Sequence, residues 1–238
     1  MYFFFLPLIF IFSLYSLSNL FNKKLKLDEF EKPIFSLGLI ILILNYLYFN
    51  FNIKLEIIFF LIVILTILSL LILLFRKKSF LHLKEISFII LLVTTLFTIV
   101  GIIYGEQFYV FRGNIHDHFV YLSTGLAFNS YNHAELINLK ENFPSQLENE
   151  FYLKHILNLI YYRPSIQLFL GLLLNFKFIN VIEVSYIFKI INTILVSLAS
   201  TRFFFKLTKN LNSSIFLSLG FVFSFYYFYN FEMDAFSL

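Results

Sequence analysis

Residues 55–75 read LEIIFFLIVILTILSLLILLF, and Glu56 is the only charged residue among them. A helix needs about 20 mostly apolar residues to cross the hydrocarbon core of a bilayer, so this stretch predicts a membrane-spanning helix. The composition of the chain agrees, because 60% of its 238 residues are hydrophobic and only 13% are charged. A soluble domain is about 45–50% apolar and about 25% charged. We therefore exclude a soluble protein and expect an integral membrane protein.

Five further stretches are long and apolar enough to span a bilayer, and a seventh is shorter. The six predicted spans are Phe3–Phe21, Ile34–Phe51, Leu55–Phe75, Ile86–Tyr104, Tyr186–Phe205 and Ile215–Phe231. The seventh stretch, Ile166–Ile179, is interrupted by Asn175 and Lys177. Short runs of this kind are more often re-entrant or interfacial than spanning. The sequence thus predicts an all-α fold, a polytopic transmembrane helical bundle.

The basic residues indicate how the bundle is oriented. They are concentrated in the first and third loops, as Lys23, Lys24, Lys26, Lys32, Arg76, Lys77, Lys78 and Lys84. Cytoplasmic loops of membrane proteins carry such an excess of Lys and Arg. We therefore expect the N-terminus and the long polar segment 105–163 outside the membrane. The net charge of +4 then reflects these loops and not a nucleic-acid partner.

A third basic loop decides how the seventh stretch is interpreted. It contains Arg202, Lys206 and Lys209. The loop is cytoplasmic only if Ile166–Ile179 does not cross the membrane. We therefore expect a re-entrant or shallow helix at Ile166–Ile179. The last span then ends on the outer side, which also holds the long loop.

The outer loop is expected to contain two amphipathic helices lying at the membrane surface. Residues 117–128 place Phe119, Leu122 and Leu126 at near-helical spacing, and residues 146–162 show a similar apolar period. Such helices roof or wall a site at the bilayer boundary. We divide the chain into 1–85, three N-terminal spans, and 86–238, which includes the outer loop.

The densest polar cluster of the outer loop is NIHDHFVY, residues 114–121. Asp117 and Tyr121 are four residues apart and share a helix face. A carboxylate here could accept a proton from a hydroxyl or bind a divalent cation. His116 and His118 flank Asp117, but two residues on a helix are about 200° apart, which disfavours a shared metal. The alternative is a solvated polar run that begins a helix.

Two other places carry residues suited to substrate binding. Arg163 precedes Pro164, and proline favours the first turn of a helix. Arg163 could bind a lipid phosphate through two hydrogen bonds, or it could be a snorkelling interfacial residue. Glu232 and Asp234 follow the last span. They are either site acids or the ordinary polar end of that helix.

The order of these parts resembles the membrane glycosyltransferases of the GT-C fold, the class of protein O-mannosyltransferases and aminoarabinose-lipid A transferases. The matching parts are Asp117 with Tyr121-Leu122, then RPSIQL at 163–168, the basic loop 202–209, and the acids Glu232 and Asp234. The resemblance covers about residues 86–238. It departs from the family in the histidines beside Asp117 and in the three spans before the matching region.

The resemblance implies an inner-membrane enzyme of a bacterial envelope. It would transfer a sugar from a polyprenyl-phosphate donor to a lipid, glycan or protein acceptor on the outer face. Asp117 would be the base or a metal-binding acid, with a divalent cation as the possible cofactor, and Arg163 would hold the lipid phosphate. His116, His118, Tyr121, Glu232 and Asp234 would contact substrate.

Other functions remain open at this stage. A polymerase or ligase of lipid-linked glycans shares the same plan of spans and an outer loop. A transporter would carry ionisable residues or helix breaks inside its spans, and we find the spans almost free of both. A non-enzymatic membrane partner is a third class. We also expect the chain to be the front part of a longer protein. This part alone would be inactive if sugar transfer also needs the rest of that protein.

Overall fold

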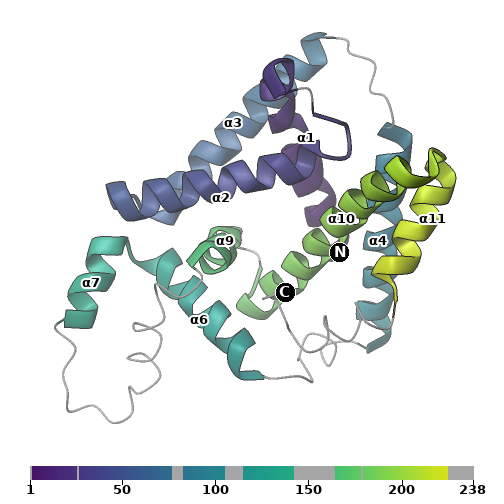
Figure 1. The fold of residues 1–238 in the computed structure, drawn as a ribbon. Coiled ribbons are helices and arrows are strands. Elements are labelled where there is room, and N and C mark those ends of the chain that lie inside the picture. Colours follow the sequence, from purple (N-terminus) through teal and green to yellow (C-terminus); the bar gives the residue numbers. More distant parts are fainter. Residues whose placement is uncertain are drawn as a thin grey trace. The chain divides into compact units, whose positions relative to one another are not determined.

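A computed structural model of the chain describes residues 2–25, 27–76, 83–104, 115–141, 164–177 and 179–224. All regular structure in these ranges is helical, as the sequence predicts (Figure 1). The helices are α1 (Tyr2–Leu25), α2 (Lys32–Phe51), α3 (Leu55–Arg76), α4 (Leu83–Tyr104), α6 (Ile115–Ser130), α7 (His133–Glu141), α9 (Pro164–Leu173), α10 (Val181–Thr208) and α11 (Leu211–Val222).

Three of these helices are long and apolar enough to cross a membrane, judged by length and composition. The qualifying segments are Lys32–Phe51, Leu55–Ile72 and Glu183–Thr208. They correspond to three of the six predicted spans and are consistent with a membrane protein. Shorter apolar helices occupy Phe5–Asn19, Pro164–Leu173 and Leu211–Val222.

The chain forms two compact units that are interleaved along the sequence. Unit 1 contains residues 1–38, 64–114 and 186–238, and unit 2 contains residues 39–63 and 115–185. Helices α2 and α3 therefore each contribute to both units. This division differs from the two consecutive regions expected from the sequence, because packing groups segments that are distant along the chain.

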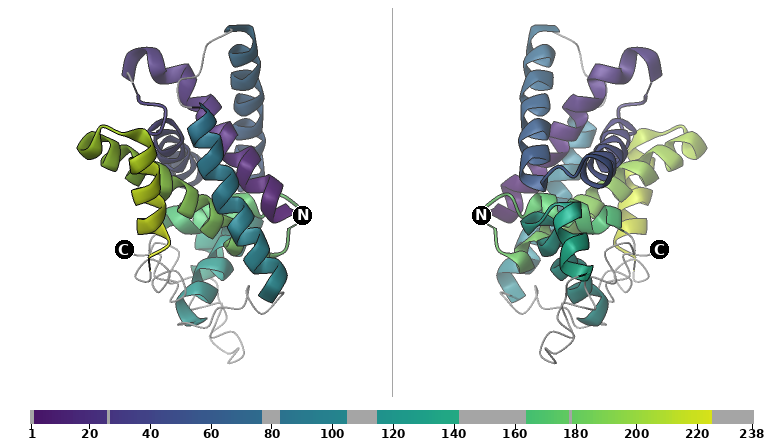
Figure 2. Two further views of the ribbon diagram at one scale, coloured as in Figure 1. Left: turned by 90° about the vertical axis from the view of Figure 1, so that its right-hand side faces the viewer. Right: turned by 90° about the vertical axis from the view of Figure 1, so that its left-hand side faces the viewer.

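Helices that are distant along the sequence pack together in unit 1. Figure 2 shows α1, in purple, beside α4, in blue, and these two helices are in contact. The hydroxyls of Ser16 in α1 and Ser69 in α3 lie 2.6 Å apart. The Tyr186 hydroxyl of α10 donates to the Phe97 carbonyl of α4 at 2.5 Å. Polar side chains inside apolar helices thus find partners on neighbouring helices.

The connection between α1 and α2 is joined to the end of α10 by ion pairs. Arg202 lies 3.4 Å from the carboxylate of Asp28 and 3.5 Å from that of Glu31. The buried ammonium of Lys32 lies 2.5 Å from Glu29 and 5.1 Å from the centroid of the Tyr15 ring. The acidic residues Asp28 and Glu31 of the first predicted loop therefore contact Arg202 of the third basic loop within unit 1.

Unit 2 is built around the contact between α6 and α9. Gly125 of α6 lies against Gly171 of α9, and the Asn129 amide donates to the Gly171 carbonyl at 2.9 Å. The predicted helix at 117–128 is confirmed by α6. Leu126 of its predicted apolar face is 45% exposed, and the face that packs on α9 contains Gly125 and Asn129.

The short helix α9 is almost entirely enclosed. Each residue from Gln167 to Leu173 is buried. Its ten residues rise about 15 Å, which is half of the hydrocarbon thickness of about 30 Å. The proline at its first position follows the sequence prediction. The second predicted surface helix, residues 146–162, lies outside the described residues.

Candidate functional site

The polar cluster around Asp117 belongs to the beginning of α6. His116, Asp117 and His118 lie in its first turn, and Tyr121, which follows on the same helix, is 6% exposed. Asp117, Tyr121, Gly125 and Asn129 follow one another at intervals of four residues. Positions four apart form one ridge on a helix surface. Gly125 and Asn129 of this ridge contact α9.

Helix α9 presents a matching ridge. Gln167 and Gly171 are four residues apart, and Asn175 follows at the same interval just beyond the helix. The Asn175 amide donates to the carbonyls of Gly171 and Leu172 at 3.3 and 3.2 Å. Arg163, the residue before Pro164, lies four residues before Gln167 in the sequence. Arg163 itself lies outside the described residues.

The two ridges approach each other more closely than side chains would allow. A methyl group added at Gly171 would lie 2.6 Å from the Gly125 carbonyl oxygen and 2.9 Å from a methyl carbon of Leu55. A methyl group added at Gly125 would lie 3.1 Å from the Gln167 carbonyl oxygen. Position 171 therefore needs glycine, whereas a methyl group at Gly125 would require the neighbouring atoms to move by a few tenths of an ångström. This contact holds the helix that begins at the Asp117 cluster directly against α9.

The C-terminal half of α2 forms another wall of unit 2. The Asn45 amide donates to the Ser165 hydroxyl of α9 at 3.1 Å. The Tyr48 hydroxyl donates to the Tyr131 carbonyl, between α6 and α7, at 2.8 Å. The rings of Phe49 and His133, the first residue of α7, have their centroids 4.9 Å apart. Helix α2 thus fixes the ends of both α6 and α9.

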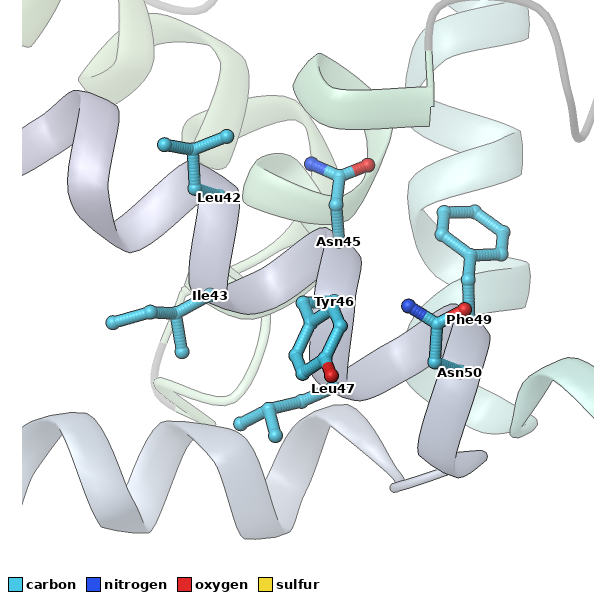
Figure 3. A pocket seen from close by; sticks show the side chains of 7 residues that line it. All are labelled: Leu42, Ile43, Asn45, Tyr46, Leu47, Phe49 and Asn50. Carbon is cyan, nitrogen blue, oxygen red and sulfur yellow. The ribbon is translucent and has the colours of Figure 1, made fainter.

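A shallow groove with a volume of about 690 Å³ runs along this part of α2 (Figure 3). Leu42 and Asn45 project to one side of the helix, and Ile43 and Leu47 project to the other. Most of the lining is apolar, as expected of a helix that faces lipid. The groove is a surface feature of α2 and contains none of the predicted site residues.

Helix α7 begins with a reciprocal cap and is tied to the end of α2. The Asn132 side chain accepts from the Glu135 N–H at 2.9 Å, and the Glu135 carboxylate accepts from the Asn132 N–H at 2.8 Å. Lys54 lies 3.3 Å from Glu135. The backbone hydrogen bond from Asn132, followed by Lys54, holds the pKa of Glu135 below its ordinary value. Sequence reasoning missed α7, although Asn132 and Glu135 have capping-box spacing.

The described structure contains only part of the predicted site. Asp117, His116 and His118 are placed by their positions in α6, and Tyr121 is buried in the same helix. Arg163, Glu232 and Asp234 lie outside the described residues. Among described side chains, no group of three His, Asp or Glu residues is arranged to hold a metal ion. A cation at Asp117 would need several further oxygen ligands.

Gln167 and Lys189 are among the buried polar residues that were not singled out from the sequence. Gln167 lies on the α9 ridge, and Lys189 lies inside α10, where it is 3% exposed. Lys189 belongs to the predicted span Tyr186–Phe205, so that span does contain an ionisable residue. A scan of each span for single charged residues would have found Lys189. No protein-family model, curated protein or solved structure matches this chain.

Proposed function

We propose that the protein is an integral membrane glycosyltransferase that transfers a sugar from a polyprenyl-phosphate donor to an acceptor on the outer face of the membrane. The observation that carries the proposal is the glycine contact between α6 and α9. This contact joins α6, which has Asp117 in its first turn, to the helix that follows Arg163. In the resemblance, those two residues are the catalytic base and the phosphate ligand.

The chemistry follows from the residue types. An acceptor hydroxyl is a weak nucleophile until a base takes its proton, and Asp117 is the proposed base. Its oxygen would receive the proton while the acceptor oxygen attacks the anomeric carbon and the bond from that carbon to the phosphate oxygen breaks. Arg163 would stabilise the polyprenyl phosphate that leaves, because a guanidinium binds phosphate through paired hydrogen bonds.

The proposed topology has six spans, with the N-terminus and the long loop outside a bacterial inner membrane. The ion pairs of Arg202 with Asp28 and Glu31 support it, because residues that form ion pairs with one another would lie on the same side of the membrane. The 15 Å rise expected of α9 also fits a segment that enters the bilayer without crossing it. The natural chain has no cysteine, which makes labelling of introduced cysteines unambiguous.

Accessibility labelling tests this topology. We expect Asn114→Cys to react with an impermeant thiol reagent from outside the cell, and Asn210→Cys to react only after the membrane is permeabilised. Labelling of both from the same side would overturn the six-span arrangement.

Transfer from a radiolabelled polyprenyl-phosphate sugar tests the activity in the full-length gene product. Loss of a general base lowers rates by about 10²–10⁴-fold, so Asp117→Asn should reduce turnover by that factor. Arg163→Ala should act mainly on KM for the donor. The matched controls are Glu141→Gln and Lys177→Ala, which change exposed charges at the ends of α7 and α9. Full activity of both site variants would refute the roles proposed for Asp117 and Arg163.

One observation favours a second class of function, transport. Ionisable residues inside spans usually mark a path for ions or substrates, and Lys189 is buried in the apolar helix α10. If transport is the function, Lys189→Met abolishes solute uptake in proteoliposomes. If sugar transfer is the function, Lys189→Met lowers the transfer activity less than Asp117→Asn does.

A further inference from the structure

The end of α10 presents exposed lysines beside exposed apolar side chains. Most of the candidate span in this helix is buried inside the protein. Near its end the packing stops, because Phe203 is 59% exposed and Leu207 is 66% exposed. Lys206 and Lys209 are exposed as well. We call these four residues the α10 tip.

Helix geometry brings the two kinds of side chain together at the α10 tip. Phe203 lies three residues before Lys206 and four residues before Leu207. Positions three and four apart are neighbours on a helix surface. Phe203 therefore borders a lysine and a leucine, and together they form one continuous surface.

The backbone that carries these side chains is held in place. Helices α10 and α11 form a hairpin (Figure 1), and the hydroxyls of Thr208 and Ser214 lie 2.8 Å apart across its turn. The Lys209 N–H donates to the Phe205 carbonyl at 3.1 Å, and Lys209 itself has a φ of 56°, the left-handed conformation that commonly ends a helix. The α10 tip is therefore an ordered part of unit 1.

The lysines of the α10 tip keep their charge available for a ligand. Arg202, one turn earlier, pairs with two carboxylates of the first loop at 3.4 and 3.5 Å. The third acid of that loop pairs with Lys32. Among the described residues, neither Lys206 nor Lys209 has an acidic partner.

The combination of charge and apolar surface narrows the choice of ligand. A dissolved anion would neutralise the lysines but leave Phe203 and Leu207 in water. A zwitterionic lipid would cover the apolar side chains but has no net charge for the lysines to bind. An anionic phospholipid satisfies both, because a lysine at the end of a span extends its ammonium group to the headgroups while its stem lies along apolar surface.

We propose that the α10 tip binds an anionic phospholipid. Lys206 and Lys209 contact the headgroup, and Phe203 and Leu207 contact the acyl chains. The binding concerns the lipid around the protein and is independent of the proposed sugar transfer.

Tryptophan fluorescence tests the proposal directly. The natural chain has no tryptophan, so Phe203→Trp introduces a single fluorophore at the α10 tip. The protein is reconstituted in mixed bilayers of phosphatidylcholine and phosphatidylglycerol, one of which carries bromine on its acyl chains and quenches tryptophan nearby. A dissolved phosphate ester cannot produce this signal, because the bromine is on the lipid.

We expect phosphatidylglycerol to bind beside this tryptophan at least about fivefold more tightly than phosphatidylcholine at low salt, the effect of one lysine at a membrane surface. Salt at about 1 M should weaken the preference, because it screens charges beyond about 3 Å. Equal binding of the two lipids at low salt would overturn the proposal.

Three further variants identify the source of the preference. In the Phe203→Trp protein, Lys206→Gln together with Lys209→Gln should bring the ratio of the two affinities close to one, and both changes are at exposed positions that leave the fold intact. Lys177→Gln, which removes an exposed lysine of unit 2, should leave the preference unchanged. Ile64→Trp, in place of Phe203→Trp, puts the fluorophore on an exposed apolar position of α3, where we expect no preference.

These variants can also contradict the proposal. A preference that survives the loss of both lysines would refute their role. An equal preference at Ile64→Trp, or an equal loss in Lys177→Gln, would show that the whole protein attracts the lipid and that the α10 tip is not a binding site.

Discussion

Replacing Gly171 by alanine should separate α6 from α9. The added methyl group would meet the Gly125 carbonyl oxygen at 2.6 Å, whereas ordinary contacts begin at 3.4 Å. The backbones must therefore move apart by about 0.8 Å, because a close-packed interface has no free space to absorb the methyl group. A shift of this size also stretches the 2.9 Å hydrogen bond from Asn129 to Gly171 beyond its useful range.

The expected loss of stability is the sum of three contributions. Overpacking costs about 1–3 kcal/mol, and the lost hydrogen bond adds about 1 kcal/mol. Alanine regains about 1 kcal/mol of helix propensity relative to glycine. The net loss of about 2 kcal/mol corresponds to a fall in melting temperature of about 4–8 °C for a chain of this size.

Two other glycines provide matched controls. Gly38 in α2 and Gly220 in α11 have no atom within 4 Å of an added methyl group. Alanine at either position gains helix propensity without a clash, so the melting temperature should stay constant or rise. The three variants can be compared by thermal denaturation in one detergent. Equal melting temperatures for Gly171→Ala and Gly38→Ala would refute the close packing of α6 on α9.

Three further changes test other contacts. Tyr48→Phe removes the hydrogen bond to the chain between α6 and α7, and a loss of about 1 kcal/mol in thermal stability is expected. Lys54→Met should raise the pKa of Glu135, measured by NMR, toward but not to its ordinary value, because the Asn132 N–H bond remains. The stabilisation that Glu135 provides is present above pH 4.5 and is lost as the pH falls below that value; an unchanged pKa would contradict the Lys54 contact. Arg202→Glu should lower the melting temperature more than Arg202→Gln, since reversal adds repulsion to the lost ion pairs.

The sequence predicts the local structure of the site region well. The helix at Asp117 and the helix start at Pro164 both follow from patterns confined to a few residues, and both are confirmed. A break in apolar character at Asn175 likewise indicates that α9 is short. These features depend on backbone preferences and spacing, which a single sequence contains.

Packing between distant segments could not be predicted in the same way. Gly125 and Gly171 lie in helices that are not consecutive in the chain, since α7 comes between them, and nothing in either neighbourhood identifies the other as its partner. Helical spacing identifies the apolar ridge with Leu126, but it does not show that the ridge with Gly125 and Asn129 is the one that meets α9. Gln167 was overlooked because an amide in an apolar run looks interfacial until its burial is known.

The most direct test of the proposed site is sugar transfer by the full-length gene product, reconstituted in proteoliposomes with a radiolabelled polyprenyl-phosphate sugar and acceptor-bearing lipids. We predict that the wild type and Glu141→Gln transfer the label and that Asp117→Asn is slower by at least about 100-fold, with all three proteins melting at similar temperatures. Equal transfer by the wild type and Asp117→Asn would contradict the role of Asp117 as the base.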